Sequence, residues 1–250
     1  MKSTISVIII AKNESINISE CIKSASFADE ILVLDSGSTD DTVSIAIEAG
    51  AKVIKTDWPG YGPQQNRAIE ASTCDWIYSL DADERITPNL AKEIQMVIHQ
   101  EEFFIFDVPR SSLFVTKFIR YSGWWPDRTR RLFKRGCAQF TNHEIHANLS
   151  SKFSVGHLKE HMIHFSYRRL DDVLEKMNRY SSGSARDLEA RGKNASLISA
   201  IGHGLWAFIR TYFIKRGFLD GAEGFILAVV NAETSYYKHL KLAFNKKFSK

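Results

Sequence analysis

The stretch "SVIIIAKNE", residues 6–14, decides the fold of this 250-residue chain. Residues 6–11 form an almost wholly apolar run rich in β-branched side chains, and Lys12, Asn13 and Glu14 follow at once. Such a run is typical of a strand that is buried on both faces of a parallel sheet. We therefore expect the three polar side chains to lie at the carboxyl end of a buried strand, where open α/β sheets bind their ligands.

Apolar runs typical of buried strands alternate with helical patterns along the first hundred residues. Within residues 38–50, Ser38 or Thr39 would cap the expected helix. This alternation predicts an α/β fold with a Rossmann-like, mostly parallel sheet and helices on both faces. The expected strands are 6–11, 30–35, 51–56 and 75–81, and the expected helices are 15–25, 38–50 and 64–72.

The pattern changes beyond residue 102. Strands are expected at 103–110 and 130–135, with an aromatic loop between them, and from about residue 170 the chain has a helical pattern to its end. These changes suggest three segments: an α/β half over 1–102, a second half of the same domain over 103–168, and a helical C-terminal region over 169–250.

Composition indicates a folded protein of mild charge. Hydrophobic residues make up 44% of the chain, enough for a sizeable core, and the net charge of +4 is too small to indicate a nucleic-acid partner. The three cysteines lie far apart in sequence, which argues against a disulfide framework or a zinc site and favours a reducing, cytoplasmic location.

Membrane contact is left open by the sequence. Residues 197–214 are the longest weakly polar stretch, but they contain His203 and Arg210 and two glycines, so we expect a poor membrane span. Two readings remain for the aromatic and basic residues between 206 and 218. They form either a helix that rests on the inner face of the cytoplasmic membrane or an amphipathic helix packed on the sheet.

Carboxylates gather at three predicted strand ends. Glu14 follows the first strand, Asp35 ends the second, and Asp81 and Asp83 follow the fourth as a D-x-D pair. Such a pair can hold Mg²⁺ or Mn²⁺ beside substrate phosphates, or it can be a solvated turn before a helix that Thr87 caps. The convergence of three strand ends favours the metal site. Glu84 would then only orient the loop through Arg85 or a backbone amide.

Other candidates lie in the second half. Glu144 in "NHEIH" has the chemistry of a general base, although a surface carboxylate is the alternative, and the spacing does not match the H-E-x-x-H of a zinc protease. Trp124 and Trp125 could stack on a sugar or anchor a loop. Arg131 could steer a diphosphate or simply decorate a strand.

Taken in order, these motifs resemble family 2 glycosyltransferases of the GT-A fold. The later stretch from residue 214 to 242 is similar to the C-terminal part of the lipopolysaccharide inner-core heptose β-1,4-glucosyltransferases. The motifs that carry the family resemblance are "SVIIIAKNE" (6–14), "ILVLDSGSTDDT" (31–42), "GPQQNRA" (62–68), "DWIYSLDADE" (75–84), "RRLF" (130–133) and "HEIH" (143–146).

The resemblance implies an inverting transfer of a sugar, with glucose favoured, from a UDP-sugar to a hydroxyl of a lipid-linked or lipopolysaccharide-core saccharide. It implies a Mg²⁺ or Mn²⁺ ion on Asp83 and an acceptor-activating base at Glu144, with Asp127 in reserve because relatives often carry E-D where this chain has H-E. Trp124 and Trp125 would contact the acceptor. The nucleotide-sugar would be bound by Lys12, Asn13, Glu14, Asp35, Gln65, Asp81 and Arg131.

Two other functions stay open at this point. A D-x-D phosphatase would use an aspartyl nucleophile, but such enzymes usually carry the pair after the first core strand, whereas here it follows the fourth. A non-catalytic module that binds nucleotide-sugars or a membrane surface would need the binding residues without the base.

Overall fold

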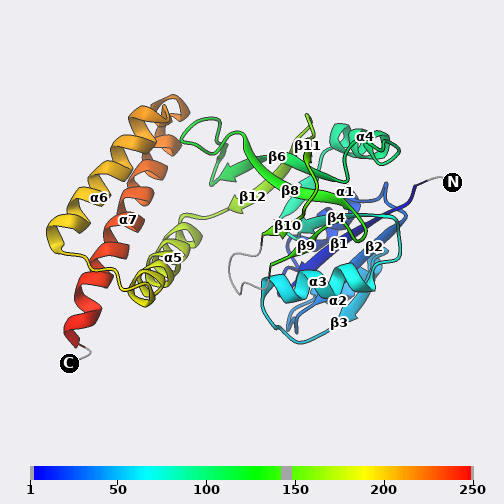
Figure 1. Cartoon of the computed structure of the whole chain (residues 1–250), viewed down its shortest axis with the longest axis horizontal. Helices are drawn as coiled ribbons and strands as arrows, with labels where there is room; N and C mark the ends of the chain where they lie inside the picture. The colour runs from blue at the N-terminus through cyan, green and yellow to red at the C-terminus, as the bar shows by residue number, and fades with distance from the viewer. Residues whose placement is uncertain (1–2, 142–147, 249–250) are drawn as a thin grey trace. The chain divides into compact units, whose positions relative to one another are not determined.

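The computed structural model of the protein describes residues 3–141 and 148–248. The chain divides into two compact units, one formed by Met1–Arg110 with Arg128–His164 and the other by Ser111–Asp127 with Phe165–Lys250 (Figure 1). These units differ from the segments expected from the sequence, because residues 111–127 cluster with the C-terminal helices rather than with the neighbouring strands.

The first four strands form the parallel part of the sheet, in the order β3-β2-β1-β4. They are β1 (Ile5–Ala11), β2 (Glu30–Asp35), β3 (Lys52–Lys55) and β4 (Trp76–Asp81). Every residue of β1 is buried, as its unbroken apolar run predicts. The predicted α/β fold is confirmed.

The sheet as a whole is mixed, because β8 pairs antiparallel with β4 and β12 pairs antiparallel with β5. The path continues from β4 through β8, β6 and β12 to β5. The remaining strands are β5 (Glu84–Ile86), β6 (Ile105–Phe114), β7 (Lys117–Phe118), β8 (Asp127–Lys134), β9 (Gln139–Phe140), β10 (Leu149–Ser150), β11 (Val155–His157) and β12 (Met162–Tyr167).

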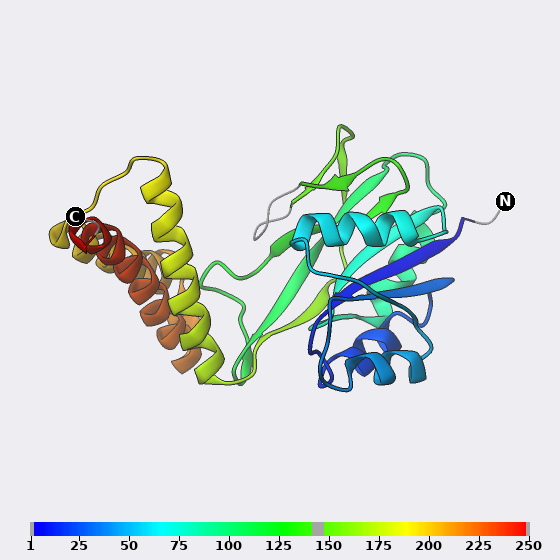
Figure 2. The same ribbon diagram turned by 90° about the horizontal axis from the view of Figure 1, so that it is seen from below.

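Helices cover both faces of the parallel strands (Figure 2). Alternate residues of β1 point to opposite faces: Val7 and Ile9 belong to one core cluster with Ile22 of α1, and Ile8 belongs to the other with Ala68 of α3. The helices of this unit are α1 (Ile18–Ser24), α2 (Thr42–Glu48), α3 (Tyr61–Ala71) and α4 (Pro88–Val97).

The helix starts show one confirmed and one wrong prediction. Thr87 caps α4, because its Oγ1 accepts a hydrogen bond from the Leu90 amide at 3.2 Å and Pro88 takes the first helical position. The predicted cap of α2 at Ser38 or Thr39 is wrong: the helix begins at Thr42, and the Ser38 hydroxyl instead accepts from the Asn13 amide at 2.9 Å.

The second unit is mainly helical, and α7 packs against both α5 and α6. A small core of Phe114, Ile119, Val173 and Leu227 lies where these helices meet residues 111–127. The elements are α5 (Leu170–Ala190), α6 (Leu197–Ile209), a π-helical segment η1 (Arg210–Ile214), a 3₁₀ segment η2 (Gly217–Asp220) and α7 (Ala222–Phe248).

One helical stretch of the described chain, Leu197–Ile214, is long and apolar enough to cross a membrane by length and composition alone. Its mean hydropathy is 1.3, and only 17% of it is buried inside the protein. A core helix of a soluble protein would be mostly buried, so the exposure of this one is the more informative observation.

Candidate active site

Asp35 ends β2 with a buried carboxylate that has one oxygen unpaired. Its Oδ2 accepts hydrogen bonds from the amides of Gly37 and Ser38, both at 3.1 Å. Its Oδ1 is buried and has no hydrogen-bond partner within the described residues. Because buried polar atoms are nearly always satisfied, this oxygen is a candidate acceptor for an N–H or O–H of a ligand.

The loop after β1 is fastened to the loop after β2. Asn13 has a positive φ of 57°, and its Oδ1 accepts a hydrogen bond from the Thr39 amide at 2.8 Å. The Glu14 amide donates to Thr42 Oγ1 at 2.7 Å, and the Glu14 carboxylate accepts from the Asn17 side chain at 2.8 Å. Lys12 is exposed beside them. The two strand ends are therefore brought together, as predicted.

β1 lies between the strands that carry the acidic residues. Ala11 pairs with Asp35 of β2, and Ile10 pairs with Asp81 of β4. The pairing places both carboxylates at the same edge of the sheet, on either side of the end of β1. This is the edge at which an open α/β sheet offers its ligand site.

Asp81 is held by an arginine that the sequence does not place beside it. Arg131 of β8 donates through Nη2 to Asp81 Oδ2 at 2.5 Å and to Glu84 Oε1 at 2.7 Å. Arg131 is buried, and its Nε has no partner in the part of the chain that the structure describes. The contact joins β8 to the end of β4.

Glu84 is the buried member of this cluster. Its Oε2 accepts a hydrogen bond from the Asp81 amide at 3.1 Å, so the expectation that it orients the loop through a backbone amide is confirmed. Arg110 lies 3.4 Å from its other oxygen. Burial raises the pKa of Glu84, while the Arg131 and Arg110 cations lower it. Burial likewise raises the pKa of the Cys21 thiol, whose sulfur donates to the Asp81 carbonyl.

Asp83 faces a histidine from a distant part of the chain. Its Oδ2 lies 3.3 Å from Nε2 of His164, because β12 pairs with β5 in a register that sets His164 opposite Glu84. No local spacing connects residues 83 and 164, so only the strand pairing reveals the contact.

A carboxylate and an imidazole together suit a divalent cation that also binds substrate phosphate. Within the described residues there is no group of three His, Cys, Asp or Glu side chains placed to hold a metal ion. The pair formed by Asp83 and His164 therefore fits an ion whose remaining ligands come from substrate and water, and does not fit a closed structural site.

Gln65 is placed differently from the other predicted residues of the first unit. It is buried in α3, and its side-chain oxygen accepts a hydrogen bond from the Ser79 hydroxyl at 3.1 Å. This contact ties α3 to β4 beneath the strand end. A role of Gln65 in binding the nucleotide-sugar stays a prediction.

The expected acceptor residues belong to a different unit from the strand-end carboxylates. Trp124 and Trp125 belong to the second unit, where Trp124 stacks on Tyr167 with ring centroids 6.1 Å apart and Arg120 lies over Trp125 at 5.5 Å. Asp127, the reserve base, begins β8 and is half-buried. Glu144 lies outside the described residues, so its role stays a prediction.

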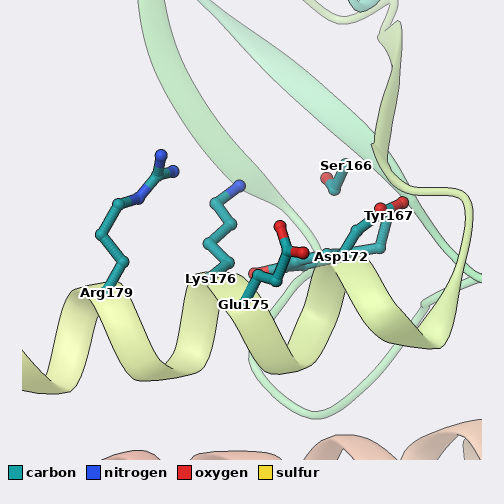
Figure 3. Close-up of a pocket in the computed structure, with 6 residues that line it drawn as sticks. All are labelled: Ser166, Tyr167, Asp172, Glu175, Lys176 and Arg179. Atoms are coloured by element: carbon teal, nitrogen blue, oxygen red, sulfur yellow. The ribbon is translucent and has the colours of Figure 1, made fainter.

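A cleft of about 390 Å³ lies in the second unit, and side chains of α5 form most of its wall (Figure 3). Lys176 lies 4.7 Å from the centre of the Tyr167 ring, and burial raises the pKa of Tyr167 to about 12. The cleft therefore combines an aromatic ring with hydrogen-bonding side chains, some of them acidic and some basic. Its lining residues are Ser166, Tyr167, Asp172, Glu175, Lys176 and Arg179.

Comparisons with known proteins agree on the family. The model of glycosyl transferase family 2 matches residues 6–155. An uncharacterized glycosyltransferase of Rickettsia felis is 31% identical over 95% of this chain and 89% of its own length. The lipopolysaccharide core biosynthesis glycosyltransferase LpsC of Rhizobium meliloti is 28% identical over 95% of this chain and 94% of its own.

Among solved structures, glucosyl-3-phosphoglycerate synthase from Mycobacterium tuberculosis, in complex with Mn²⁺, UDP and glucosyl-3-phosphoglycerate, matches with a TM-score of 0.39 and 29% identity. That match covers 44% of each chain. The family model spans more than half of the sequence and contains the strand ends that carry Asp35, Asp81 and Asp83. The chain belongs to glycosyltransferase family 2 and is a glycosyltransferase.

Proposed function

We propose that this enzyme moves a sugar, glucose by preference, from a UDP-sugar to a hydroxyl of a lipopolysaccharide-core or other lipid-linked saccharide. The observation that carries the proposal is the set of carboxylates at the ends of β2 and β4. Asp35 and Asp81 lie on either side of β1, and Asp83 follows two residues after Asp81, between β4 and β5. In a glycosyltransferase, that edge of the sheet is where a nucleotide-sugar is expected to bind.

Asp35 would recognise the base or ribose of the nucleotide. Its free Oδ1 can accept one hydrogen bond, which suits the ring N–H of uracil, while Oδ2 stays fixed by the Gly37 and Ser38 amides. The loop tied by Asn13 would close over the same end of the sheet. The resemblance to family motifs, which places Glu14 and Asp35 beside uracil and ribose, supports the same assignment.

Asp83 and His164 would hold a Mg²⁺ or Mn²⁺ ion. When bound, such an ion supplies positive charge that stabilises the departing diphosphate. Arg131 would have a positioning role. It is buried and donates hydrogen bonds to Asp81 and Glu84, so it would hold the Asp81 carboxylate in place at the site. Direct contact between Arg131 and the diphosphate remains part of the proposal.

The transfer would invert the configuration at the sugar C1 carbon. The bond from C1 to the diphosphate oxygen breaks as a bond from C1 to the acceptor oxygen forms, and the hydroxyl proton passes to a carboxylate base. We assign that base to Glu144, with Asp127 as the alternative. The acceptor class rests on the name of the Rhizobium relative and on the resemblance of the C-terminal stretch.

The acceptor saccharide would stack on tryptophan side chains. Trp124 and Trp125 remain the proposed contacts, and the cleft beside Tyr167 adds an aromatic ring and paired charges that suit sugar hydroxyls. We place the reaction in the cytoplasm, because the wide spacing of the three cysteines in the sequence favours a reducing compartment.

The proposal is tested by following UDP release from a panel of UDP-sugars in the presence of lipopolysaccharide-core acceptors and Mn²⁺. We expect Asp83→Asn to slow release by about 10²- to 10³-fold, the range seen when one electrostatic contact to a transition state is removed. Asp57→Asn, which alters an exposed carboxylate paired with Arg67, is the matched control and should keep full activity.

Two outcomes would overturn the proposal. Phosphate release from simple phosphomonoesters without any nucleotide-sugar would favour a phosphatase. Tight UDP binding with no release for any acceptor extract would favour a non-catalytic binding module.

A further inference from the structure

Helix α6 turns its large apolar side chains outward. The exposed fractions of Ile198, Leu205 and Trp206 are 83%, 60% and 55%, whereas Ala200 and Gly204 are buried. At about 100° per residue, Ile198 and Leu205 lie opposite the two small residues. A helix of a soluble protein normally buries its large apolar side chains, so this reversed pattern needs a partner outside the unit.

The exposed apolar surface continues past α6 into η1, η2 and the start of α7. Tyr212 joins these elements, because its ring lies 5.1 Å from Phe213, 6.2 Å from Phe218 and 5.6 Å from Phe225. We define the apolar face as the exposed residues Ile198, Ile201, Leu205, Trp206, Phe213, Ile214, Phe218, Leu219, Phe225 and Ile226.

Cations outnumber acids along this face, where Glu223 is a part-exposed acid that accepts a hydrogen bond from the Thr116 hydroxyl at 2.6 Å. Residues 197–219 contain Arg210, Lys215 and Arg216 and no Asp or Glu. The next acid, Asp220, is buried and accepts hydrogen bonds from the amides of Arg120 and Tyr121 at 3.0 and 2.9 Å. The whole second unit carries 17 Lys and Arg against 9 Asp and Glu, a formal net charge of +8.

We propose that the apolar face binds the surface of a bilayer that contains anionic phospholipids. Apolar side chains with interspersed aromatic rings suit the boundary between headgroups and acyl chains, and the long basic side chains can reach the phosphates. A second copy of the chain is the other occupant to consider, but two units of charge +8 would repel each other where a lipid surface attracts.

The face lies on the bilayer and does not cross it. A methyl group added at Gly204 would come within 3.1 Å of Tyr236 Cβ and 3.3 Å of the Ala232 carbonyl oxygen, so α6 is closely packed on α7. Asn231 of α7 also donates to Thr211 at 3.3 Å. To cross a membrane, α6 would have to carry α7, with Glu233 and Lys238, into the hydrocarbon.

The test is co-sedimentation of the full chain with vesicles of phosphatidylcholine alone or with 30% phosphatidylglycerol (about a third anionic lipid, as in a strongly negative leaflet). We expect binding at least about tenfold tighter to the anionic vesicles, and its loss in high salt. Ile198→Ser/Leu205→Ser should weaken binding to the anionic vesicles by about tenfold or more. Arg210→Gln/Arg216→Asn should weaken it by about fivefold for each cation removed.

Matched controls come from the first unit. Ile47→Ser/Met96→Ser removes two exposed apolar side chains there, and Lys52→Gln/Lys92→Gln removes two exposed cations. Both double variants should bind vesicles like the unchanged protein. Circular dichroism of each variant verifies that the helices are intact, and no sugar donor or acceptor is added, so the result is independent of the proposed reaction.

The depth of insertion is read from Trp206 fluorescence, as the difference between the unchanged protein and Trp206→Phe on vesicles with brominated lipids. Quenching by bromines near the headgroups supports the surface orientation, and stronger quenching by bromines at the bilayer centre would overturn it. The proposal also fails if anionic vesicles are not bound, if the controls lose binding equally, or if light scattering shows dimers that the Ile198→Ser/Leu205→Ser change dissolves.

Discussion

Glu84 is the residue whose structural role differs most from its appearance in the sequence. It stands in an acidic knot with Asp81 and Asp83, yet it is fully buried and faces Arg131 and the Asp81 amide. Its carboxylate fixes both the backbone and the cationic partner of Asp81. We therefore regard Glu84 as a positioning residue for Asp81, the residue proposed to contact the nucleotide-sugar.

Replacing Glu84 by Gln should be costly to stability. The change keeps the shape but removes one of the two carboxylates that balance the buried Arg131 cation, and breaking a buried ion pair typically costs about 3–5 kcal/mol. Because Asp81 remains as a partner, we expect the free energy of unfolding in urea to fall by about 3 kcal/mol. Glu48→Gln, at an exposed carboxylate, should change it by less than about 0.5 kcal/mol. An unchanged midpoint for Glu84→Gln would contradict this role.

At this scale the sequence identifies acids but not their partners. Asp35, Asp81 and Asp83 could be predicted because each follows a recognisable buried strand. Arg131 and His164 are 50 and 81 positions from Asp81 and Asp83 in the chain and reach them only because their strands pair, and no local pattern encodes such contacts. The different environments of Asp81, which is part-exposed, and Glu84, which is buried, likewise cannot be read from spacing alone.

At the scale of elements, the junction of η2 and α7 depends on a glycine. A methyl group at Gly224 would lie 1.9 Å from the Gly217 carbonyl oxygen and 2.9 Å from Asp220 Cβ, so the backbone itself would have to move. We expect Gly224→Ala to lower the free energy of unfolding by about 2 kcal/mol through overpacking.

The matched control for this prediction is Gly183→Ala on α5, where the added methyl group meets nothing within 4 Å. That change should raise stability by about 0.5–1 kcal/mol, because Ala is the better helix former. Denaturant unfolding of the two variants compares the effects directly. Equal effects of the two changes would contradict the close packing at Gly224.

The contact between α6 and α7 should loosen in acid. The rings of His203 and His239 stack 3.9 Å apart, and burial lowers the pKa of His239, with smaller contributions from His203 and Lys238. A lowered pKa in the folded state means that the unfolded chain takes up the proton first. Stability is therefore present above the ordinary pKa of 6.5 and is lost as the pH falls through the folded value.

Hydrogen exchange of the α6 and α7 amides, corrected for intrinsic rates, measures this effect. Protection should fall between about pH 7 and pH 5 in the unchanged protein and fall less in His239→Gln. An identical pH dependence in the two proteins would show that the stacked pair has no such function.

The elements themselves were predictable to different degrees. The four parallel strands, the helices between them and the long C-terminal helices follow from apolar runs and helical periodicity. The antiparallel part of the sheet was not predictable from the sequence. There β8 pairs with β4 through residues that are more than 50 positions apart in the chain. The start of α2 was also missed, since Ser38 serves the neighbouring loop instead of the helix.

At the scale of the whole molecule, the net charge of +4 conceals a strong asymmetry. The second unit carries +8, so the first unit, which has 16 Lys and Arg against 20 Asp and Glu, carries −4. The acidic unit contains the strand ends where a metal ion and a nucleotide are proposed to bind. The basic unit contains the apolar face proposed to meet lipid. Overall composition could not reveal this division, because the charge of the first unit offsets half of that of the second.

The central claim is that Asp83 couples a divalent cation to nucleotide binding at the strand ends. Isothermal titration of UDP, with and without Mn²⁺, tests it most directly and requires no acceptor. We expect Mn²⁺ to tighten UDP binding by about tenfold or more in the unchanged protein, which corresponds to about 1.4 kcal/mol. In Asp83→Asn the Mn²⁺ effect should vanish while weak metal-free binding through Asp35 persists. A Mn²⁺ effect of the same size in both proteins would contradict the account.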